Sequence, residues 1–405
     1  MQGMDFERIL GGVCAPEGFL ASAVSCGIKE KGELDLALLY SETPAVAVGA
    51  FTRNELKAAP VIYSQKCIES KTARAVVVNS GNANSMTGSR GLGDAEAMAA
   101  TVEKALDLSS GTVLVASTGP IGEYLPMEKV TRGIEQAVAE LSPGGNTDAA
   151  KGIMTTDTYP KELAVEMEIA GKVVRMGAMA KGSGMIHPDL ATLLCFLTTD
   201  ADISGDFLRE ALREAADVSF NMVSIDGDTS TNDTLLILAN GLAGGGTINK
   251  DSPPAAVFQA TLKRACIHRA RAIARDGEGA TRLIEVKVTG AASLADARLA
   301  ARTIVSSPLV KSAVHGCDPN WGRVLAAAGR SGAELVPDRL ELHIGGIRLV
   351  EGGSPVPFRR EEVAKHLGGS EVYINLNLHI GQAEAVAWGC DLSEEYVTIN
   401  SEYTT

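Results

Sequence analysis

Thr192 stands where a glycine-rich turn meets an apolar segment, a setting in which a hydroxyl could become a nucleophile. The chain around it reads Lys181-Gly-Ser-Gly-Met-Ile-His-Pro-Asp-Leu-Ala-Thr192-Leu-Leu-Cys-Phe-Leu. A threonine hydroxyl attacks poorly unless a base activates it, and an N-terminal amine can be that base. The ordinary pKa of such an amine, about 7.7–8.0, leaves a fair fraction neutral at cellular pH. Thr192 would gain this amine if the chain were cut before it.

A cut between Ala191 and Thr192 has a simple route within the chain itself. The Thr192 hydroxyl attacks the Ala191 carbonyl, the acyl group moves from nitrogen to oxygen, and water hydrolyses the resulting ester. The small Ala191 side chain leaves room around that bond. The competing interpretation is an ordinary strand threonine, because threonine favours strands and mostly packs there or bonds to backbone. Taken alone, these residues favour the second interpretation.

The surrounding pattern predicts strands and helices in mixed order. Apolar runs predict strands at 75–78, 112–116, 164–169, 173–179, 193–197, 234–238, 283–289 and 372–379. Apolar residues at helical spacing predict helices at 206–218, 254–275 and 293–305. Ser293, with Asp296 three residues on, is a candidate N-cap of the last helix. Several adjacent strands mixed with helices predict an α/β fold, a layered sandwich of sheets and helices.

Polar loops rich in glycine lie between these elements, at 79–84, 117–122, 181–184, 226–233 and 276–279. Glycine permits unusual backbone angles and close approach to a ligand, while Asn, Asp and Thr supply short polar groups. Such loops often carry function on a rigid scaffold, although many of them only turn the chain.

The composition is that of a globular chain without an affinity for nucleic acid. Of the 405 residues, 45% are hydrophobic and 21% charged, a balance that supports a sizeable core. The net charge of −13 argues against nucleic-acid binding, which needs clustered Lys and Arg. One basic stripe at helical spacing is expected to be a solvated face. Its members are Arg264, His268, Arg271 and Arg275.

The cysteines and the first residues indicate where the protein resides. Seven scattered cysteines without a CxxC pair predict free thiols in a reducing compartment. Six dispersed histidines without an HxxxH pair predict no metal site. The first residues lack the pattern of a signal peptide, and no segment approaches the roughly 20 apolar residues that cross a bilayer. We therefore expect a soluble cytoplasmic protein that binds neither metal nor membrane.

Several long motifs, in one order, resemble a single known family. Besides the block 181–200, they are Val78-Asn-Ser-Gly-Asn-Ala-Asn84, Ser117-Thr-Gly119, Thr155-Thr-Asp-Thr-Tyr-Pro-Lys161, Asp226-Gly-Asp-Thr-Ser-Thr-Asn-Asp233, Asp318-Pro-Asn-Trp-Gly-Arg323 and Ile399-Asn-Ser-Glu-Tyr-Thr-Thr405. Together they resemble the ornithine acetyltransferase (glutamate N-acetyltransferase) family of arginine biosynthesis. The resemblance covers nearly the whole chain, and it overturns the ordinary interpretation of Thr192.

The resemblance implies a role for each candidate site residue. Thr192 is the nucleophile, both for the cut after Ala191 and for an acetyl-enzyme. Thr118 and Gly119 resemble the oxyanion-hole pair, and two donors suit the charge of a tetrahedral intermediate. Five further positions match residues that bind the amino-acid substrates, where a cation suits a carboxylate and an anion suits an amino group. These are Thr155, Lys181, Glu278, Asn400 and Thr405.

Without the family these residues have plainer interpretations. Thr118-Gly119 would be a strand-to-loop turn, and Lys181 a surface lysine. Glu278, between two glycines, would be a solvated turn residue, and the tail from Asn400 would be frayed.

Four places depart from the familiar pattern or remain without a role. Pro120 removes an N–H next to the oxyanion pair, although the two named donors remain. His187 and Asp189 stand where other residues are more familiar, and His187 could tune the cut or simply pack. The segment 318–323 is read as a turn beside core residues, without a catalytic role.

The family implies a ping-pong acetyltransferase without metal or organic cofactor. It moves the acetyl group of N2-acetylornithine to glutamate through acetyl-Thr192, releasing ornithine, and acetyl-CoA is left open as a further donor. The expected fragments are 1–191 and 192–405, paired in an α2β2-type assembly. Within the second, 192–280 would complete the catalytic sandwich, 281–395 would form a smaller α/β domain, and 396–405 would return to the site. The alternatives are a self-cleaving aminopeptidase or amidase of similar fold, and a binding protein that has kept the fold.

Overall fold

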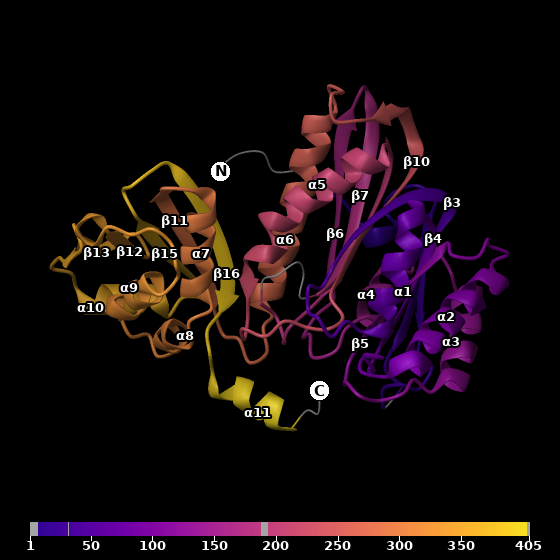
Figure 1. Cartoon of the computed structure of the whole chain (residues 1–405), viewed down its shortest axis with the longest axis horizontal. Helices are drawn as coiled ribbons and strands as arrows, with labels where there is room; N and C mark the ends of the chain where they lie inside the picture. The colour runs from indigo at the N-terminus through magenta and orange to yellow at the C-terminus, as the bar shows by residue number, and fades with distance from the viewer. Residues whose placement is uncertain (1–6, 31, 188–192, 403–405) are drawn as a thin grey trace.

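In the computed structural model, residues 7–30, 32–187 and 193–402 are described below. A nine-stranded sheet forms the larger part of the molecule (Figure 1). Its strands follow the order β1 (Glu7–Arg8), β6 (Lys161–Ile169), β7 (Lys172–Lys181), β8 (Leu194–Ile203), β10 (Thr234–Ile248), β3 (Leu36–Phe51), β4 (Thr72–Ser80) and β5 (Val113–Thr118), with β2 (Phe19–Val24) also paired to β3. Strand β3 has a register shift against β4 between Tyr40 and Ala45.

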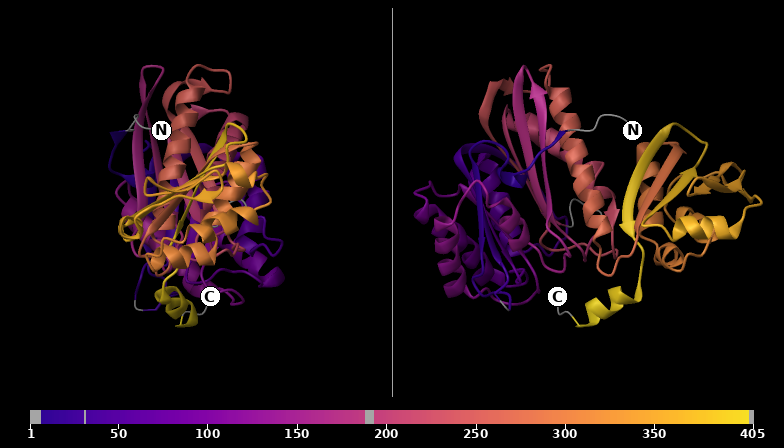
Figure 2. Two further views of the ribbon diagram at one scale, coloured as in Figure 1. Left: turned by 90° about the vertical axis from the view of Figure 1, so that its left-hand side faces the viewer. Right: turned by 180° about the vertical axis from the view of Figure 1, so that it is seen from behind.

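This sheet is folded so that its two halves face each other across an inner core. Alternate residues of a strand point to opposite faces. Accordingly, Val76 and Val78 of β4 pack in the inner core, whereas Val77 packs outward. Phe196 of β8 and Leu236 of β10 reach the same inner core from the other half. The view from behind shows the two halves as separate layers (Figure 2, right).

Helices cover both outer faces of the folded sheet. Helices α2 (Gly88–Ala105) and α3 (Met127–Ala139) pack outside β3–β5. Helices α5 (Gly205–Asp217) and α6 (Ala255–Arg275) pack outside β6–β8 and β10. Two shorter helices, α1 (Ala59–Cys67) and α4 (Asn146–Gly152), contribute apolar residues to the inner core. The result is a helix–sheet–sheet–helix sandwich, which confirms the predicted α/β class.

A second, seven-stranded sheet lies beside α6 (Figure 1). Its strands follow the order β14 (Ser354–Pro355), β13 (Ile347–Glu351), β12 (Glu341–Ile344), β15 (Glu371–Asn377), β11 (Leu283–Ala291), β16 (Ala383–Cys390) and β9 (Val223–Ser224). The helices of this part are α7 (Leu294–Val305), α8 (Pro308–His315), α9 (Trp321–Gly329) and α10 (Arg360–Leu367). Ser293 caps α7, as predicted, by accepting a hydrogen bond from the Asp296 N–H at 3.1 Å.

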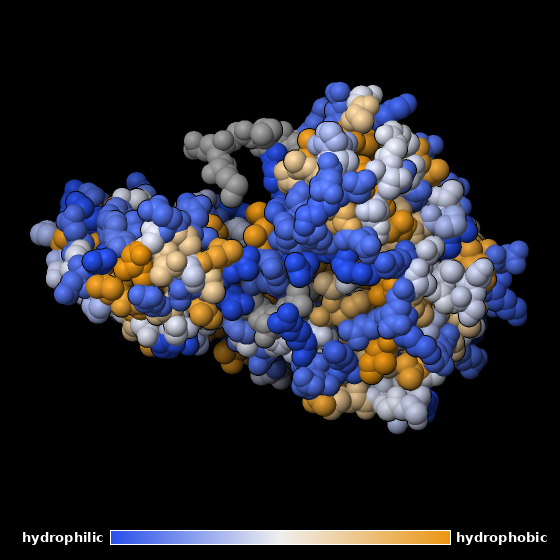
Figure 3. Space-filling view, turned by 45° about the horizontal axis from the view of Figure 1, so that its top comes forward, coloured by the Kyte–Doolittle hydropathy of each residue, from blue (hydrophilic) through white to orange (hydrophobic). Residues whose placement is uncertain are grey.

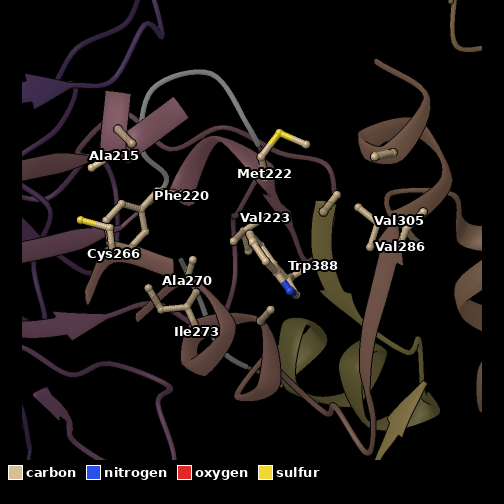
Figure 4. Close-up of a cluster of buried hydrophobic side chains, with 14 of the residues drawn as sticks. Ala215, Phe220, Met222, Val223, Cys266, Ala270, Ile273, Val286, Val305 and Trp388 are labelled. Atoms are coloured by element: carbon tan, nitrogen blue, oxygen red, sulfur yellow. The ribbon is translucent and has the colours of Figure 1, made fainter. Parts of the chain in front are cut away.

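One continuous core joins the two parts of the molecule. Trp388 of β16 stands opposite Val223 of β9 and lies close to Ile273 of α6, while Val305 of α7 closes the far side (Figure 4). The Trp388 indole donates to Glu285 Oε2 at 2.8 Å, so its polar N–H is satisfied at the edge of this core.

The basic stripe of α6 is not the solvated face that its sequence pattern predicts. Arg271 donates to Glu285 Oε2 at 2.8 Å and to Glu371 Oε2 at 3.2 Å. Arg275 donates to the Ser370 carbonyl at 2.7 Å. The stripe therefore ties α6 to strands β11 and β15 of the second sheet. Such contacts cannot be anticipated from helical spacing alone, because the acceptors lie far along the chain.

The surface and the end of the chain complete the description. Hydrophilic side chains prevail on the face drawn in Figure 3, with hydrophobic ones interspersed. Among the described residues, no helix is long and apolar enough to cross a membrane. After β16 the chain runs into helix α11 (Glu394–Glu402), which has no buried residue and stands apart from both sheets (Figure 1).

Candidate active site

A cleft of about 240 Å³ opens between the two halves of the folded sheet. One wall is the end of β5, and the other is the end of β7 with the beginnings of β8 and β10. It brings together every described residue of the candidate site, from positions far apart in the sequence. These are Thr118, Gly119, Thr155, Lys181, Glu278 and Asn400. Ala191, Thr192 and Thr405 lie outside the described residues, but Leu193, which follows Thr192, also lines the cleft.

The Thr118–Gly119 turn is fixed by close backbone packing against the loop after β4. The Thr118 carbonyl accepts from the Asn82 N–H at 3.0 Å, and the Pro120 carbonyl accepts from the Ala83 N–H at 3.0 Å. Gly119 has φ +139°, and a Cβ there would lie 2.3 Å from the Asn82 nitrogen. Only glycine fits, which explains why the 78–84 motif accompanies Ser117-Thr-Gly119.

Lys181 lies at the end of β7 and bridges two threonines. Its Nζ donates to Thr155 Oγ1 at 2.7 Å and to Thr118 Oγ1 at 3.2 Å. The side chain is not a surface lysine, since Lys181 is only 8% exposed. Burial lowers the pKa of Lys181, although the negative charge of Asp157 opposes this shift. The cation thus sits within the cleft, beside the candidate oxyanion residue.

Glu278 is held in place from two sides. Its Oε1 accepts from Thr156 Oγ1 at 2.7 Å, and its Oε2 accepts from Asn400 Nδ2 at 2.8 Å. The Glu278 N–H donates to the Ser183 carbonyl at 2.8 Å. A Cβ on Gly184 would lie 2.5 Å from the Glu278 carboxyl carbon, so the glycine makes room for this acid. Glu278 is buried at the cleft rather than a solvated turn residue.

The comparison with known families decides the relationship of this chain. The family described as the ArgJ family matches residues 20–405. The chain belongs to the ArgJ family. This confirms the family expected from its motifs, and with it an enzyme of the acyltransferase kind.

Relatives match over nearly their whole length. The arginine biosynthesis bifunctional protein ArgJ of Symbiobacterium thermophilum is 52% identical over 401 residues, covering 98% of this chain and 100% of the relative. The protein of the same name in Dehalococcoides mccartyi is 50% identical over 397 residues, covering 98% of each. A crystal structure of the argJ protein from Bacillus halodurans is 45% identical with a TM-score of 0.51, covering 51% of this chain and 98% of that chain.

A buried ion network behind the cleft of this ArgJ-family chain was not anticipated. Lys161 Nζ lies 2.6 Å from Asp157 Oδ1 and 2.5 Å from Asp276 Oδ2. Asp157 Oδ1 also accepts from the Gly182 N–H at 2.8 Å, next to Lys181. Burial alone would raise the pKa of Asp157, but the positive charges of Lys181 and Lys161 outweigh it and lower the pKa. Asp157 and Lys161 both belong to the 155–161 motif, and this motif is the sequence feature that could have indicated the network.

The 226–233 motif contributes further residues that the sequence did not single out. Asp226 accepts from the Met185 N–H at 2.5 Å and from the Ile186 N–H at 2.9 Å, which fixes the turn after β7. Asp233 lines the cleft near Leu193. The motif was recognised as a family feature, but its spacing alone did not say which members face the cleft. Asp226, Asp228, Ser230, Asn232 and Asp233 do.

The remaining singled-out residues have structural partners or lie elsewhere. His187 Nδ1 is 3.1 Å from Ser224 Oγ, and Asp189 lies outside the described residues. Asn320 caps α9 by accepting from the Arg323 N–H at 3.3 Å, away from the cleft lining. Across the described ranges, no group of His, Cys, Asp and Glu could hold a metal ion.

Proposed function

We propose that this chain is an acetyltransferase that moves the acetyl group of N2-acetylornithine to glutamate through an acetyl-Thr192 intermediate. The observation that carries the proposal is that Thr118, Gly119, Lys181 and Glu278 line one cleft together with Leu193, the residue after Thr192. Membership of the ArgJ family supports the same chemistry. The covalent acyl-threonine carries the group, so no metal or organic cofactor takes part.

The first half-reaction follows from these positions. The α-amino group of Thr192 takes the proton of its own hydroxyl, and Oγ1 attacks the acetyl carbonyl. The developing oxyanion receives hydrogen bonds from the Gly119 N–H and the Thr118 hydroxyl. The amine then passes its proton to the nitrogen of ornithine as the carbon–nitrogen bond breaks. In the second half-reaction the glutamate amine attacks the ester and takes the acetyl group.

Charge in the cleft suits amino-acid substrates. Lys181 attracts the α-carboxylate that N2-acetylornithine and glutamate share. Glu278 and Asn400, together with Thr155, orient the rest of the molecule. Because donor and acceptor share one set of contacts, each must leave before the other binds, which is ping-pong kinetics.

The nucleophile arises by self-cleavage between Ala191 and Thr192, giving fragments 1–191 and 192–405. The Bacillus halodurans crystal chain supports this step, because 98% of it matches only 51% of this chain, the length expected of one fragment. The fragments then stay paired, and two such pairs form an α2β2 assembly.

A second activity is included in the proposal: acetyl-CoA also acylates Thr192, so that glutamate is acetylated without ornithine. The relatives support it by their name, which calls them bifunctional. Assays of the purified protein with acetyl-CoA and glutamate test it directly, by formation of N-acetylglutamate and free CoA.

The main test combines intact mass with product analysis. Wild-type protein should show two fragments and should form N-acetylglutamate from N2-acetylornithine only when glutamate is present. Thr192→Ala should remain a single inactive chain, whereas the control Thr101→Ala, on the outer helix α2, should be cut and active. Two fragments from Thr192→Ala would remove the assignment. Acetate, formed equally with or without glutamate, would identify an amidase instead.

A further inference from the structure

Asp233 has a buried carboxyl group, one oxygen of which accepts no hydrogen bond from the described residues. It is 3% exposed and lines the cleft. Its Oδ2 has no hydrogen-bond partner among the described residues. The neighbouring Asp226 differs, since both its oxygens accept backbone N–H groups. A buried unsatisfied oxygen is costly to keep, so its presence in a reaction cleft calls for a functional explanation.

The strand register places Asp233 beside Leu193, the residue that follows Thr192. Strand β10 begins with Thr234, which pairs in parallel with Leu194 of β8. The Thr234 N–H donates to the Leu193 carbonyl at 2.9 Å. Asp233 directly precedes Thr234, and Leu193 directly precedes Leu194, so the two residues occupy equivalent positions before β10 and β8. Asp233 and Leu193 both line the cleft. The bond to be cut, between Ala191 and Thr192, is one residue further back along the chain from Leu193.

The surroundings of Asp233 favour its protonated form. Burial raises its pKa well above the ordinary value, while local hydrogen bonding and the positive charge of Lys181 act in the opposite direction. The other charged groups that line the cleft are acids, which do not stabilise a further negative charge. They are Asp226, Asp228 and Glu278.

We propose that Asp233 is a catalytic residue of the self-cleavage step, in which its Oδ2 proton is delivered to the nitrogen of Thr192. The inference rests on the proposed function, because it requires that the chain is cut there. The bond between Thr192 Oγ1 and the Ala191 carbonyl carbon forms, and the bond between that carbon and the Thr192 nitrogen breaks. The nitrogen leaves as an amine because Asp233 supplies its proton.

The step balances without another reactant. The proton lost by the Thr192 hydroxyl restores Asp233 to its acid form, so one proton has moved from oxygen to nitrogen. Water then hydrolyses the ester at Ala191. Without an acid at this position, the nitrogen would have to leave as an amide anion, which is a far poorer leaving group.

The test follows cleavage of the full chain after cell-free synthesis is stopped, by denaturing gel and intact mass. Asp233→Asn should slow cleavage by about 10²–10⁴-fold, the usual contribution of a general acid. Asp94→Asn is the matched control, because Asp94 also has a buried unpartnered Oδ2 but lies in α2 and does not line the cleft. It should be cut at the wild-type rate.

Chemical rescue separates proton transfer from support of the fold. In Asp233→Gly, formate should restore cleavage in proportion to its protonated fraction, so rescue grows as the pH falls, and formamide should not rescue. A folded Asp233→Gly chain that ignores formate would overturn the proposal, as would an Asp233→Asn chain cut at the wild-type rate. Thr192→Ala in the same assay distinguishes failure of the proposed cleavage by Thr192 from failure of the proposed role of Asp233. If it is cut, the proposed function fails; if it stays whole while Asp233→Asn is cut normally, only the role of Asp233 fails.

Discussion

The Glu278 carboxylate and the Asn400 amide connect the C-terminal helix to the cleft through a 2.8 Å hydrogen bond. Helix α11 buries none of its residues, so its position depends on a few polar contacts such as this one. A second contact is the hydrogen bond from Ser393 Oγ to the Gly279 carbonyl at 2.6 Å. Helix α11 therefore contributes to the cleft although none of its residues is buried.

Removing the tail should separate cleavage from acetyl transfer. A chain truncated after Ile399 loses Asn400 and so leaves Glu278 Oε2 without its partner. We expect normal cutting at Ala191–Thr192, followed by poor transfer in both half-reactions, because donor and acceptor use the same contacts. Intact mass and single-turnover assays measure the two steps. Full activity of a folded truncated chain would show that the tail is dispensable, and loss of cutting would show that it supports the fold.

Replacing Thr118 should affect the rate of chemistry more than substrate binding. Lys181 Nζ donates to Thr118 Oγ1 at 3.2 Å, which leaves the hydroxyl hydrogen free to point at an oxyanion. Thr118→Ala should lower kcat by about 10²–10³-fold, the usual cost of losing one oxyanion donor. Thr118→Ser keeps the hydroxyl and serves as the control. An unchanged kcat with a raised KM in Thr118→Ala would instead assign Thr118 to substrate positioning.

Gly119 and Gly122 form a matched pair of turn glycines. Both have positive φ, +139° and +89°. A Cβ at Gly119 would lie 2.3 Å from the Asn82 nitrogen, whereas a Cβ at Gly122 would meet nothing within 4 Å. Gly122→Ala should cost only the backbone strain, about 1–3 kcal/mol, and keep acetyl transfer. Gly119→Ala should lose more stability and most of the activity. Thermal unfolding and steady-state kinetics measure both, and equal effects in the two variants would contradict this reasoning.

Lys161 should be essential to the stability of the fold. It is 1% exposed and neutralises both Asp157 and Asp276. Lys161→Met leaves two buried carboxylates together and should lower the free energy of unfolding by about 3–5 kcal/mol. Lys250→Met is the control, because Lys250 Nζ lies 2.6 Å from Glu210 Oε1 but on the surface, where an ion pair contributes little. Urea unfolding of both variants provides the measurement, and similar losses would mean that the buried network is not stabilising.

The same network predicts how stability responds to acid. The pKa of Asp157 is lowered in the fold from the ordinary value of 3.8. A carboxylate with a lowered pKa stabilises the fold above the unfolded value, and this contribution is lost as the pH falls through the folded value. The destabilisation caused by Asp157→Asn should therefore be constant near neutrality and shrink only below about pH 3.8. Urea unfolding at successive pH values checks this, and a loss that begins well above that pH would point to other groups.

The elements that the sequence predicted are those with regular apolar patterns. Helix α6 matches the predicted 254–275 almost residue for residue, because its apolar face is uninterrupted. Strand β3 was missed, since Ser41-Glu-Thr-Pro44 interrupts its pattern at the place where its register shifts against β4. Helix α2 was missed as well, because Gly88, Gly91 and Gly93 crowd its first turns. A local sequence pattern therefore fails to predict a strand or helix that contains such an interruption but is stabilised by its tertiary contacts.

The site shows a similar limit. Thr118, Lys181 and Glu278 could be named from motifs, but their roles were supplied by the resemblance and stay predictions. No sequence rule pairs Glu278 with Asn400, which is 122 positions further along the chain. Asp233 stood within a quoted motif whose neighbouring residues are buried as well, and its unpartnered carboxyl oxygen is what distinguishes it among the described residues.

The strand order has a consequence for the protein that the proposed cut would produce. In the sheet, β8 and β10 of the second fragment lie between β7 and β3 of the first. Fragments formed by the proposed cut could not separate without breaking both the β7–β8 and the β10–β3 backbone hydrogen-bond ladders, so they would stay paired. Folding of the intact chain is unimolecular, whereas reassembly of separated fragments would depend on their concentration. Under the proposed cut, the chain would fold as one molecule, but fragments unfolded after the cut could no longer refold by that unimolecular route.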